Sequence, residues 1–155
     1  MTSQATVSQR GFIDAAPDTS LRVPHFWEVT WNTLRRLMKG PLASPPPTAA
    51  RDSLLLDACV SLRAGRVNDA SAMLSPHRSV LARDAGYLNL LGVVCEVRRQ
   101  WKLARRFYGV AMSVDSRHEP AQLNMRRMYE LYTFGRSREP LALGDLELRR
   151  SRTLS

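Results

Sequence analysis

Residues 89–116, NLLGVVCEVRRQWKLARRFYGVAMSVDS, read as two amphipathic helices joined by a tight turn around Gln100. Gly92 falls in the middle of the first helix and Ala104 one turn into the second. Because a glycine inside a helix costs about 1 kcal/mol relative to alanine, something must offset it. We expect the two helices to cross closely at Gly92 and Ala104. The side chains expected around this crossing are those of Leu91, Phe107, Tyr108 and Met112.

The same pattern recurs at a fixed interval along the chain. This interval, called the period below, equals the difference in residue number between Ala58 and Gly92. A shift by this period also places Ala70 on Ala104, so that small residues align with small ones. Bulky residues align as well, in the pairs Val67 and Trp101, Leu74 and Tyr108, Leu91 and Met125, and Cys95 and Tyr129. A repeated helix-turn-helix unit is typical of solenoid proteins, in which neighbouring units bury a shared core.

The unit over residues 85–118 resembles the tetratricopeptide repeat, whose length matches the period. It has a Leu-Gly pair in the first helix, an aromatic residue opening the second, small and aromatic residues at the family's spacing, and a closing apolar-Asp pair. These residues are Leu91, Gly92, Trp101, Ala104, Tyr108, Ala111, Val114 and Asp115. The unit departs from the family at Leu88, Cys95 and Ser116, where the family has Trp, Tyr and Pro. The resemblance implies an all-α, right-handed helix-turn-helix solenoid over residues 51–134, with two repeats and a capping helix.

The two flanking units are less regular. In the first unit, Gly65 is expected to end the first helix, and Pro76 to break the second near Ser75 and restart it. A single capping helix is expected to close the array. Ser116 and Glu119 have capping-box spacing at its start, and its outer face is expected to be polar.

Four segments lie outside the repeats. Residues 1–23 are expected to be disordered, 24–39 to form an amphipathic helix, 40–50 a proline-rich linker, and 135–155 a basic, irregular tail. The apolar stripe of this docking helix, residues 24–39, comprises Phe26, Trp27, Trp31, Leu34 and Met38. Three positions are open for the docking helix: on its own repeat domain, in a partner, or at a membrane interface.

In proteins of the family that the chain resembles, the inner face of the first helices binds peptides. The resemblance implies a partner groove lined by Leu55, Cys59, Leu62, Asn89, Val93, Val97, Leu123, Arg127 and Glu130. The set of Lys, Asn and Arg side chains with which some members hold a C-terminal carboxylate is lacking. A mostly apolar groove suits an amphipathic helix from a partner. The alternative is that a short array buries this face against itself.

The net charge of +9 is spread along the chain. A basic protein attracts anionic partners in general. One basic stripe is expected on the outer surface, either solvated or in contact with an acidic protein or anionic lipid; it comprises Arg98, Lys102, Arg105 and Arg106. RNA is a third partner on charge alone, but nucleic acid is disfavoured because no aromatic residues are interleaved on the exposed side to stack bases.

No catalytic residue, cofactor or metal site is predicted. The three histidines lie in unrelated segments, and the chain has no glycine-rich phosphate loop or nucleophile elbow. Cys59 and Cys95 fall on apolar helices and are expected to be buried thiols. Without a signal-peptide pattern or an apolar run of about 18 residues, a cytoplasmic location is expected, with peripheral attachment to the inner face of a membrane as the alternative.

Together these features predict a non-catalytic adaptor that holds other proteins in one assembly through the groove and the docking helix. A two-repeat core is small for a domain standing alone, which favours a subunit of a hetero-oligomeric complex. Two other classes stay open: a peripheral membrane-associated factor anchored by the docking helix, and a basic RNA-binding module.

Overall fold

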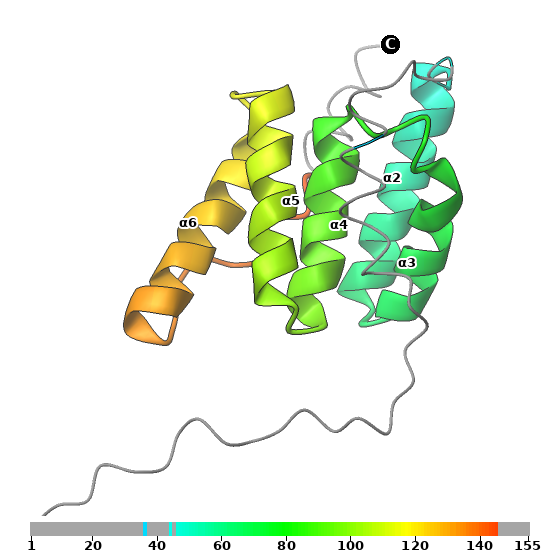
Figure 1. Ribbon diagram of the computed structural model, residues 1–155. Helices are drawn as coiled ribbons and strands as arrows, with labels where there is room; N and C mark the ends of the chain where they lie inside the picture. The colour runs from blue at the N-terminus through cyan, green and yellow to red at the C-terminus, as the bar shows by residue number, and fades with distance from the viewer. Residues whose placement is uncertain (1–35, 37–43, 45, 146–155) are drawn as a thin grey trace, which may run out of the picture.

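The computed structural model describes residues 36, 44 and 46–145, and every regular element within this part of the chain is helical. The elements are α2 (Thr48–Arg63), α3 (Val67–Leu74), the short 3₁₀ helix η1 (Ser75–His77), α4 (Ala85–Val97), α5 (Trp101–Val114) and α6 (Glu119–Phe134). Figure 1 shows the helices in one row, from α2 and α3 through α4 and α5 to α6. The expectation of an all-helical domain is confirmed for these residues.

Equivalent helices begin one period apart. Trp101, the first residue of α5, lies one period after Val67, the first residue of α3. Glu119, the first residue of α6, lies one period after Ala85, the first residue of α4. α2 begins earlier than expected, at Thr48 inside the proline-rich stretch, with Pro47 as the residue before the helix.

The turns after α2 and α4 share one geometry. Gly65 and Arg99 occupy equivalent positions and have φ values of 73° and 60°, in the left-handed region. After α2, the Arg66 N–H donates to the carbonyl of Ser61 at 2.9 Å, and the corresponding bond closes the turn after α4. Gly65 therefore ends α2 as the sequence predicts, whereas Arg99 adopts a conformation that favours glycine.

The close crossing predicted at Gly92 is present. A Cβ atom on residue 92 would lie 2.6 Å from Cδ1 of Tyr108, closer than real Cβ contacts allow. Ala104, Phe107 and Tyr108 are fully buried beside it. The small residue in α4 therefore makes room for an aromatic ring of α5, which offsets the cost of a glycine in a helix.

The predicted break in the second helix is confirmed. α3 ends at Leu74, and Pro76 lies in the first turn of η1. Proline has no N–H to continue the ladder of hydrogen bonds. The hydroxyl of buried Tyr87 donates to the carbonyl of Leu74 at 3.0 Å, so an α4 side chain bonds the end of α3.

The start of α6 differs from the expected capping box. The residue before the helix is His118, and no side chain caps it. Ser116 lies farther upstream, where its carbonyl accepts from the side-chain amide of Gln122 at 2.6 Å. The Asp115 carboxylate instead accepts from the backbone N–H of Arg117 at 2.9 Å. Neither the Ser116 hydroxyl nor the Asp115 carboxylate caps the first turn of α6, which begins at Glu119.

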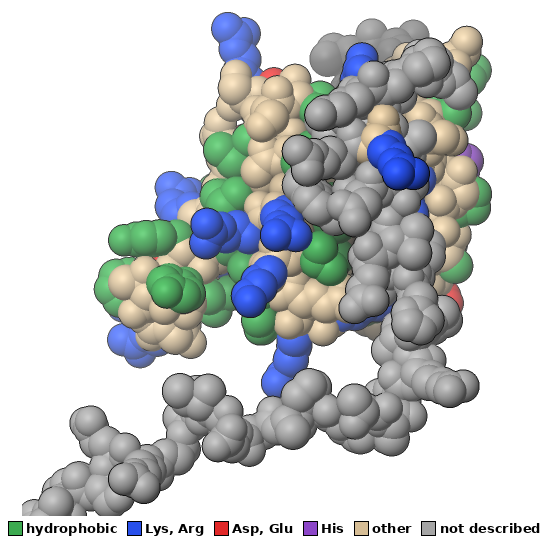
Figure 2. All heavy atoms as spheres, in the orientation of Figure 1, with side chains coloured by type: hydrophobic (Ala, Val, Ile, Leu, Met, Phe, Trp, Pro, Cys, Tyr) green, Lys and Arg blue, Asp and Glu red, His purple; other side chains and the backbone are tan. Residues whose placement is uncertain are grey.

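The outer surface of α6 is also less polar than expected. Tyr132 is 89% exposed, and Tyr129 and Phe134 are exposed as well. Figure 2 shows hydrophobic side chains gathered over this helix. The array therefore ends on an aromatic surface, although Arg126 contributes a charge to the same helix.

Candidate peptide-binding groove

The C-terminal segment, residues 136–145, lies across the inner face of the helix row. It follows the C-cap residue of α6, Gly135, which is in the left-handed conformation. Its backbone or side chains bond to α6, then to α4, and finally to α2. Figure 1 shows the orange-to-red end of the described chain passing behind the helices. The face shared by α2, α4 and α6, called the groove below, is therefore occupied.

Two asparagines bind the main chain of the segment. Asn124 of α6 donates to the carbonyl of Ala142 at 2.7 Å and accepts from its N–H at 2.9 Å. Asn89 of α4 donates to the same carbonyl at 3.0 Å. Asn124 also donates to the side-chain oxygen of Asn89 at 2.9 Å. Both asparagines are fully buried, so the segment supplies partners that buried amides need.

Charged side chains hold the two ends of the segment. Arg127 of α6 donates to the carbonyl of Glu139 at 2.9 Å. Arg63 of α2 contacts both carboxylate oxygens of Asp145 at 2.7 Å. Charge-assisted bonds of this kind are stronger than neutral ones. The segment is thus fixed at its entry, at its centre and at its exit.

Apolar contacts fill the middle of the groove. Leu143 is buried in the hydrophobic core, and its carbonyl lies 3.8 Å from the Sγ of Cys59. Leu141 is partly buried against the same core. Hollows of about 550 Å³ and about 470 Å³ adjoin the segment, and Leu143 lines both. The segment therefore leaves part of the inner face uncovered.

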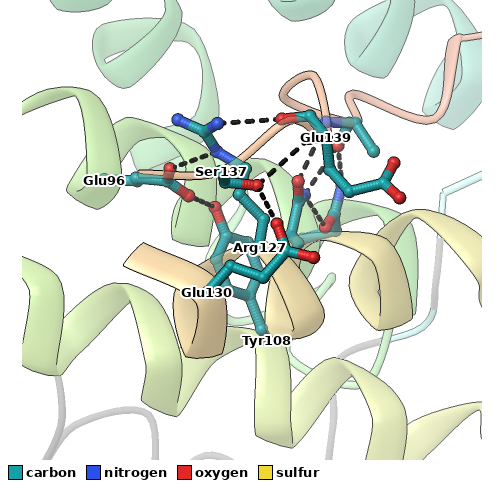
Figure 3. Close-up of polar contacts among 9 residues, drawn as sticks. Glu96, Tyr108, Arg127, Glu130, Ser137 and Glu139 are labelled. Carbon is teal, nitrogen blue, oxygen red and sulfur yellow. Dashed lines mark hydrogen bonds and ion pairs between the residues drawn. The ribbon is translucent and has the colours of Figure 1, made fainter. Parts of the chain in front are cut away.

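A buried ion pair lies beneath the entry of the segment (Figure 3). The carboxylate of Glu96, 4% exposed, accepts from Nε of Arg127 and from the hydroxyl of Tyr108, each at 2.8 Å. Burial and the neighbouring carboxylate both raise the pKa of the Tyr108 hydroxyl. Because Arg127 also binds the carbonyl of Glu139, this network joins α4, α5, α6 and the segment.

A second polar contact positions the start of the segment. The hydroxyl of Ser137 donates to Glu130 of α6 at 2.5 Å and accepts from the N–H of Glu139 at 3.1 Å. The side chain of Glu139 lies 3.5 Å from Arg126 at the surface. These bonds turn the chain back along α6 immediately after Gly135.

The residues predicted to line the groove fall into three groups. Those that bond to the segment are Cys59, Asn89, Arg127 and Glu130. Those that line the larger hollow are Leu62, Val97 and Leu123. Leu55 and Val93 are buried in the core. The resemblance placed them on one face, but it could not show which of them meet a ligand and which meet the core.

The residues at this site that were not predicted from the sequence are Arg63, Glu96 and Asn124 of the helices and those of the segment itself. Arg63 and Glu96 read as ordinary surface charges on amphipathic helices. Asn124 carried a usable signal, because it lies one period plus one residue after Asn89. Two amides at that separation fall on neighbouring first helices of an array with this period.

The other predicted surfaces are described only in part. The docking-helix residues Phe26, Trp27, Trp31, Leu34 and Met38 lie outside the described residues. In the basic stripe, Lys102, Arg105 and Arg106 are exposed, and Figure 2 shows Lys and Arg side chains over α5. Arg98 is half-buried and donates to Asn68 at 2.8 Å. Burial lowers the pKa of Arg98.

In the part of the chain that the structure describes, the side chains that most often act as nucleophiles or metal ligands are either buried or dispersed. Cys59 and Cys95 are buried and form no disulfide, as predicted, and burial raises the pKa of the Cys95 thiol to about 12. Among the described residues, no three His, Cys, Asp or Glu side chains are grouped to hold a metal ion. None of the described helices is both long enough and apolar enough to cross a membrane.

No protein-family model, curated protein or solved structure matches the chain. The function is therefore inferred from the groove and from the segment that lies in it.

Proposed function

We propose that the chain is a non-catalytic, tetratricopeptide-like adaptor whose groove binds an extended segment of a partner protein. The regular spacing of the helix starts and the close packing of Gly92 on Tyr108 support the repeat assignment. The bonding of Asn89 and Asn124 to the main chain of Ala142 is the observation that carries the function.

An extended peptide fits this arrangement better than an amphipathic helix does. Asn124 engages both the N–H and the carbonyl of one residue. In a helix these groups are bonded within the helix, whereas an extended chain leaves them open. Recognition of the main chain supplies affinity, and the apolar contacts beside it supply specificity. The expectation of a helical ligand is therefore replaced here by an extended one.

The groove also has room for more than the segment that it holds. The hollow of about 550 Å³ lies between the segment and the side chains of Leu62, Val97 and Leu123. A partner with larger side chains on either side of its central residue would fill this space. Buried apolar surface there would add to the affinity provided by the amide contacts.

The proposal is tested by site-specific cross-linking in native lysate. A photo-reactive residue at position 123 lies in the groove, and the same residue at position 102 lies on the exposed surface of α5 as the matched control. Position 123 is expected to cross-link partner peptides that position 102 does not. The proposal fails if position 123 cross-links only residues of its own chain.

A further inference from the structure

We infer that residues 136–145 are an intramolecular ligand that closes the groove, and that the partner carries an extended segment of the same chemistry. That chemistry is a small residue between two leucine-like residues, followed by glycine and an acidic residue, as in Leu141–Asp145. The inference rests on the proposed function, because it names the ligand and the regulation of the same groove.

The segment is bonded as a ligand rather than as an element of the fold. The groove bonds to it through side chains of Asn89, Asn124, Arg63 and Arg127, which bind its main chain or the side-chain carboxylate of Asp145. It forms no regular structure from residue 136 to residue 144. Removing it would leave a face already shaped for an extended chain.

Each position from Leu143 onward has its own requirement. Leu143 is buried in the hydrophobic core, so a charged residue there is excluded. Gly144 has φ of 87°, and a Cβ atom on it would lie 3.3 Å from Cγ of Pro120. Asp145 is buried and meets Arg63 with both its carboxylate oxygens. An apolar residue, glycine and an acid are therefore selected in that order.

The centre of the segment selects for size rather than for charge. Ala142 lies between the two asparagines, which bond to its N–H and its carbonyl but not to its side chain. Ala142 itself is half-buried, so its side chain is not fully open to solvent. We therefore expect a small residue at the equivalent position of the partner.

A tethered ligand suppresses binding of free ones without blocking it. Linkage within one chain gives the segment a high effective concentration at the groove. The apparent dissociation constant of a free peptide rises in inverse proportion to the open fraction of the protein. A partner that adds contacts in the hollow beside Leu123 can displace the segment, whereas a weak peptide cannot.

The experiment measures binding of the fluorescein-labelled peptide RSREPLALGD, amidated at its C-terminus, to the full-length protein. Fluorescence anisotropy compares the wild type with two variants that are substituted within the segment, Leu143→Asp and Ala142→Pro. The first places a charge in the core, and the second removes the N–H that donates to Asn124. Circular dichroism and the oligomeric mass of each protein are measured alongside, so that a misfolded variant is recognised and the other one used.

Both variants are expected to bind the peptide at least tenfold more tightly than the wild type, as monomers. A peptide with Asp145→Asn is expected to bind several-fold more weakly because it loses the charge that Arg63 meets. A peptide with Leu143→Asp is expected not to bind. Together these results would assign both the closure of the groove and the chemistry of its ligand.

Other outcomes overturn the inference in distinct ways. Equal affinity of wild type and variants would mean that the segment does not compete. A wild-type dimer that Leu143→Asp dissociates would mean that the segment occupies a second copy instead. If no folded variant binds the peptide but position 123 still cross-links a partner of different sequence, the ligand chemistry is wrong and the proposed function stands. If neither binding nor cross-linking occurs, the proposed function fails as well.

Discussion

Gly92 of α4 and Tyr108 of α5 lie so close that no side chain fits between them. A Cβ atom on residue 92 would come within 2.6 Å of Cδ1 of the ring. The ring has little freedom to retreat, because it is fully buried and its hydroxyl donates to Glu96 at 2.8 Å. In the first helix pair the equivalent positions hold Ala58 and Leu74. Alanine is larger than the glycine at position 92, and leucine is smaller than the tyrosine at position 108.

Gly92→Ala is therefore expected to destabilise the protein. Moving the Tyr108 ring costs about 1–3 kcal/mol in a well-packed core. This exceeds the gain of about 1 kcal/mol from replacing glycine by alanine in a helix. The measurement is urea denaturation followed by circular dichroism. The control is Gly109→Ala in α5, where the new Cβ would meet only Met125 Cε at 3.7 Å, and which should stabilise instead. Equal effects of the two substitutions would contradict the packing argument.

Arg99→Gly is expected to stabilise the protein. Arg99 has φ of 60°, which costs a residue with a Cβ atom about 1–2 kcal/mol. Glycine avoids that cost but loses about 0.5–1 kcal/mol through the greater freedom of the unfolded chain. The net gain of up to about 1.5 kcal/mol would raise the melting temperature by several degrees, as measured by thermal denaturation.

The reciprocal control for Arg99→Gly is Gly65→Arg. Gly65 occupies the equivalent turn with φ of 73°, and a Cβ atom there would meet nothing within 4 Å. Any loss of stability then reflects the backbone conformation and not a clash. A neutral result at both positions would show that the two turns relax without strain.

The elements that could be predicted are those that depend on local sequence. The resemblance implied that Trp101 opens a helix, and the period aligned Val67 with it; these residues begin α5 and α3. Pro76 fixed the break after α3, because the ring removes a donor wherever it stands in a helix. The site could be predicted only as a face, since the resemblance places residues on the inner side of the helices without saying what covers it.

The C-terminal segment could not be predicted because nothing local specifies it. Residues 138–145 have no helical period, and their binding depends on Asn124 and Asn89, which are distant in sequence. The predicted cap of α6 was wrong for a related reason. Local spacing favoured Ser116, but the helix begins at Glu119, and His118 is the residue before it. The segment depends on hydrogen bonds to residues distant in sequence, and α6 begins later along the chain than the capping-box spacing placed it.

Asn124→Ala is expected to release the segment and to destabilise the fold. It leaves the N–H of Ala142 and the side-chain oxygen of Asn89 without their present partner. Leaving a buried polar group unsatisfied costs about 1–3 kcal/mol. Hydrogen exchange should show the Ala142 amide exchanging at least tenfold faster. The matched control is Asn68→Ala, because Asn68 is exposed and bonds only at the surface. Unchanged protection of Ala142 would argue against the asparagine clamp.

Removing one member of the buried ion pair should cost more than removing the whole network. Arg127→Leu leaves the Glu96 carboxylate buried without its positive partner, a change that costs about 3–5 kcal/mol in other proteins. The triple variant Glu96→Leu, Arg127→Leu, Tyr108→Phe removes the three polar side chains that meet at the ion pair and should recover much of that loss. Denaturation in urea measures both. A triple variant that is less stable than Arg127→Leu would show that the charges stabilise the fold by themselves.

Alkaline pH is expected to destabilise the protein through buried groups that stay protonated when folded. Burial raises the pKa of Cys95 from 9.0 to about 12 and that of Tyr87 from 10.0 to about 12. Both groups release their protons more readily in the unfolded chain. The stability that these two protonated groups contribute to the folded state is therefore fully present below pH 9. It is lost as the pH rises toward 12. Each group lowers the free energy of unfolding by about 1.4 kcal/mol per pH unit within its own window.

Urea denaturation between pH 7 and 11 measures this slope. Cys95→Ala should make the fall shallower above pH 9 while leaving a constant offset from the wild type between pH 7 and 8.5. If the two curves stay parallel throughout, the thiol does not carry the predicted share of the pH dependence.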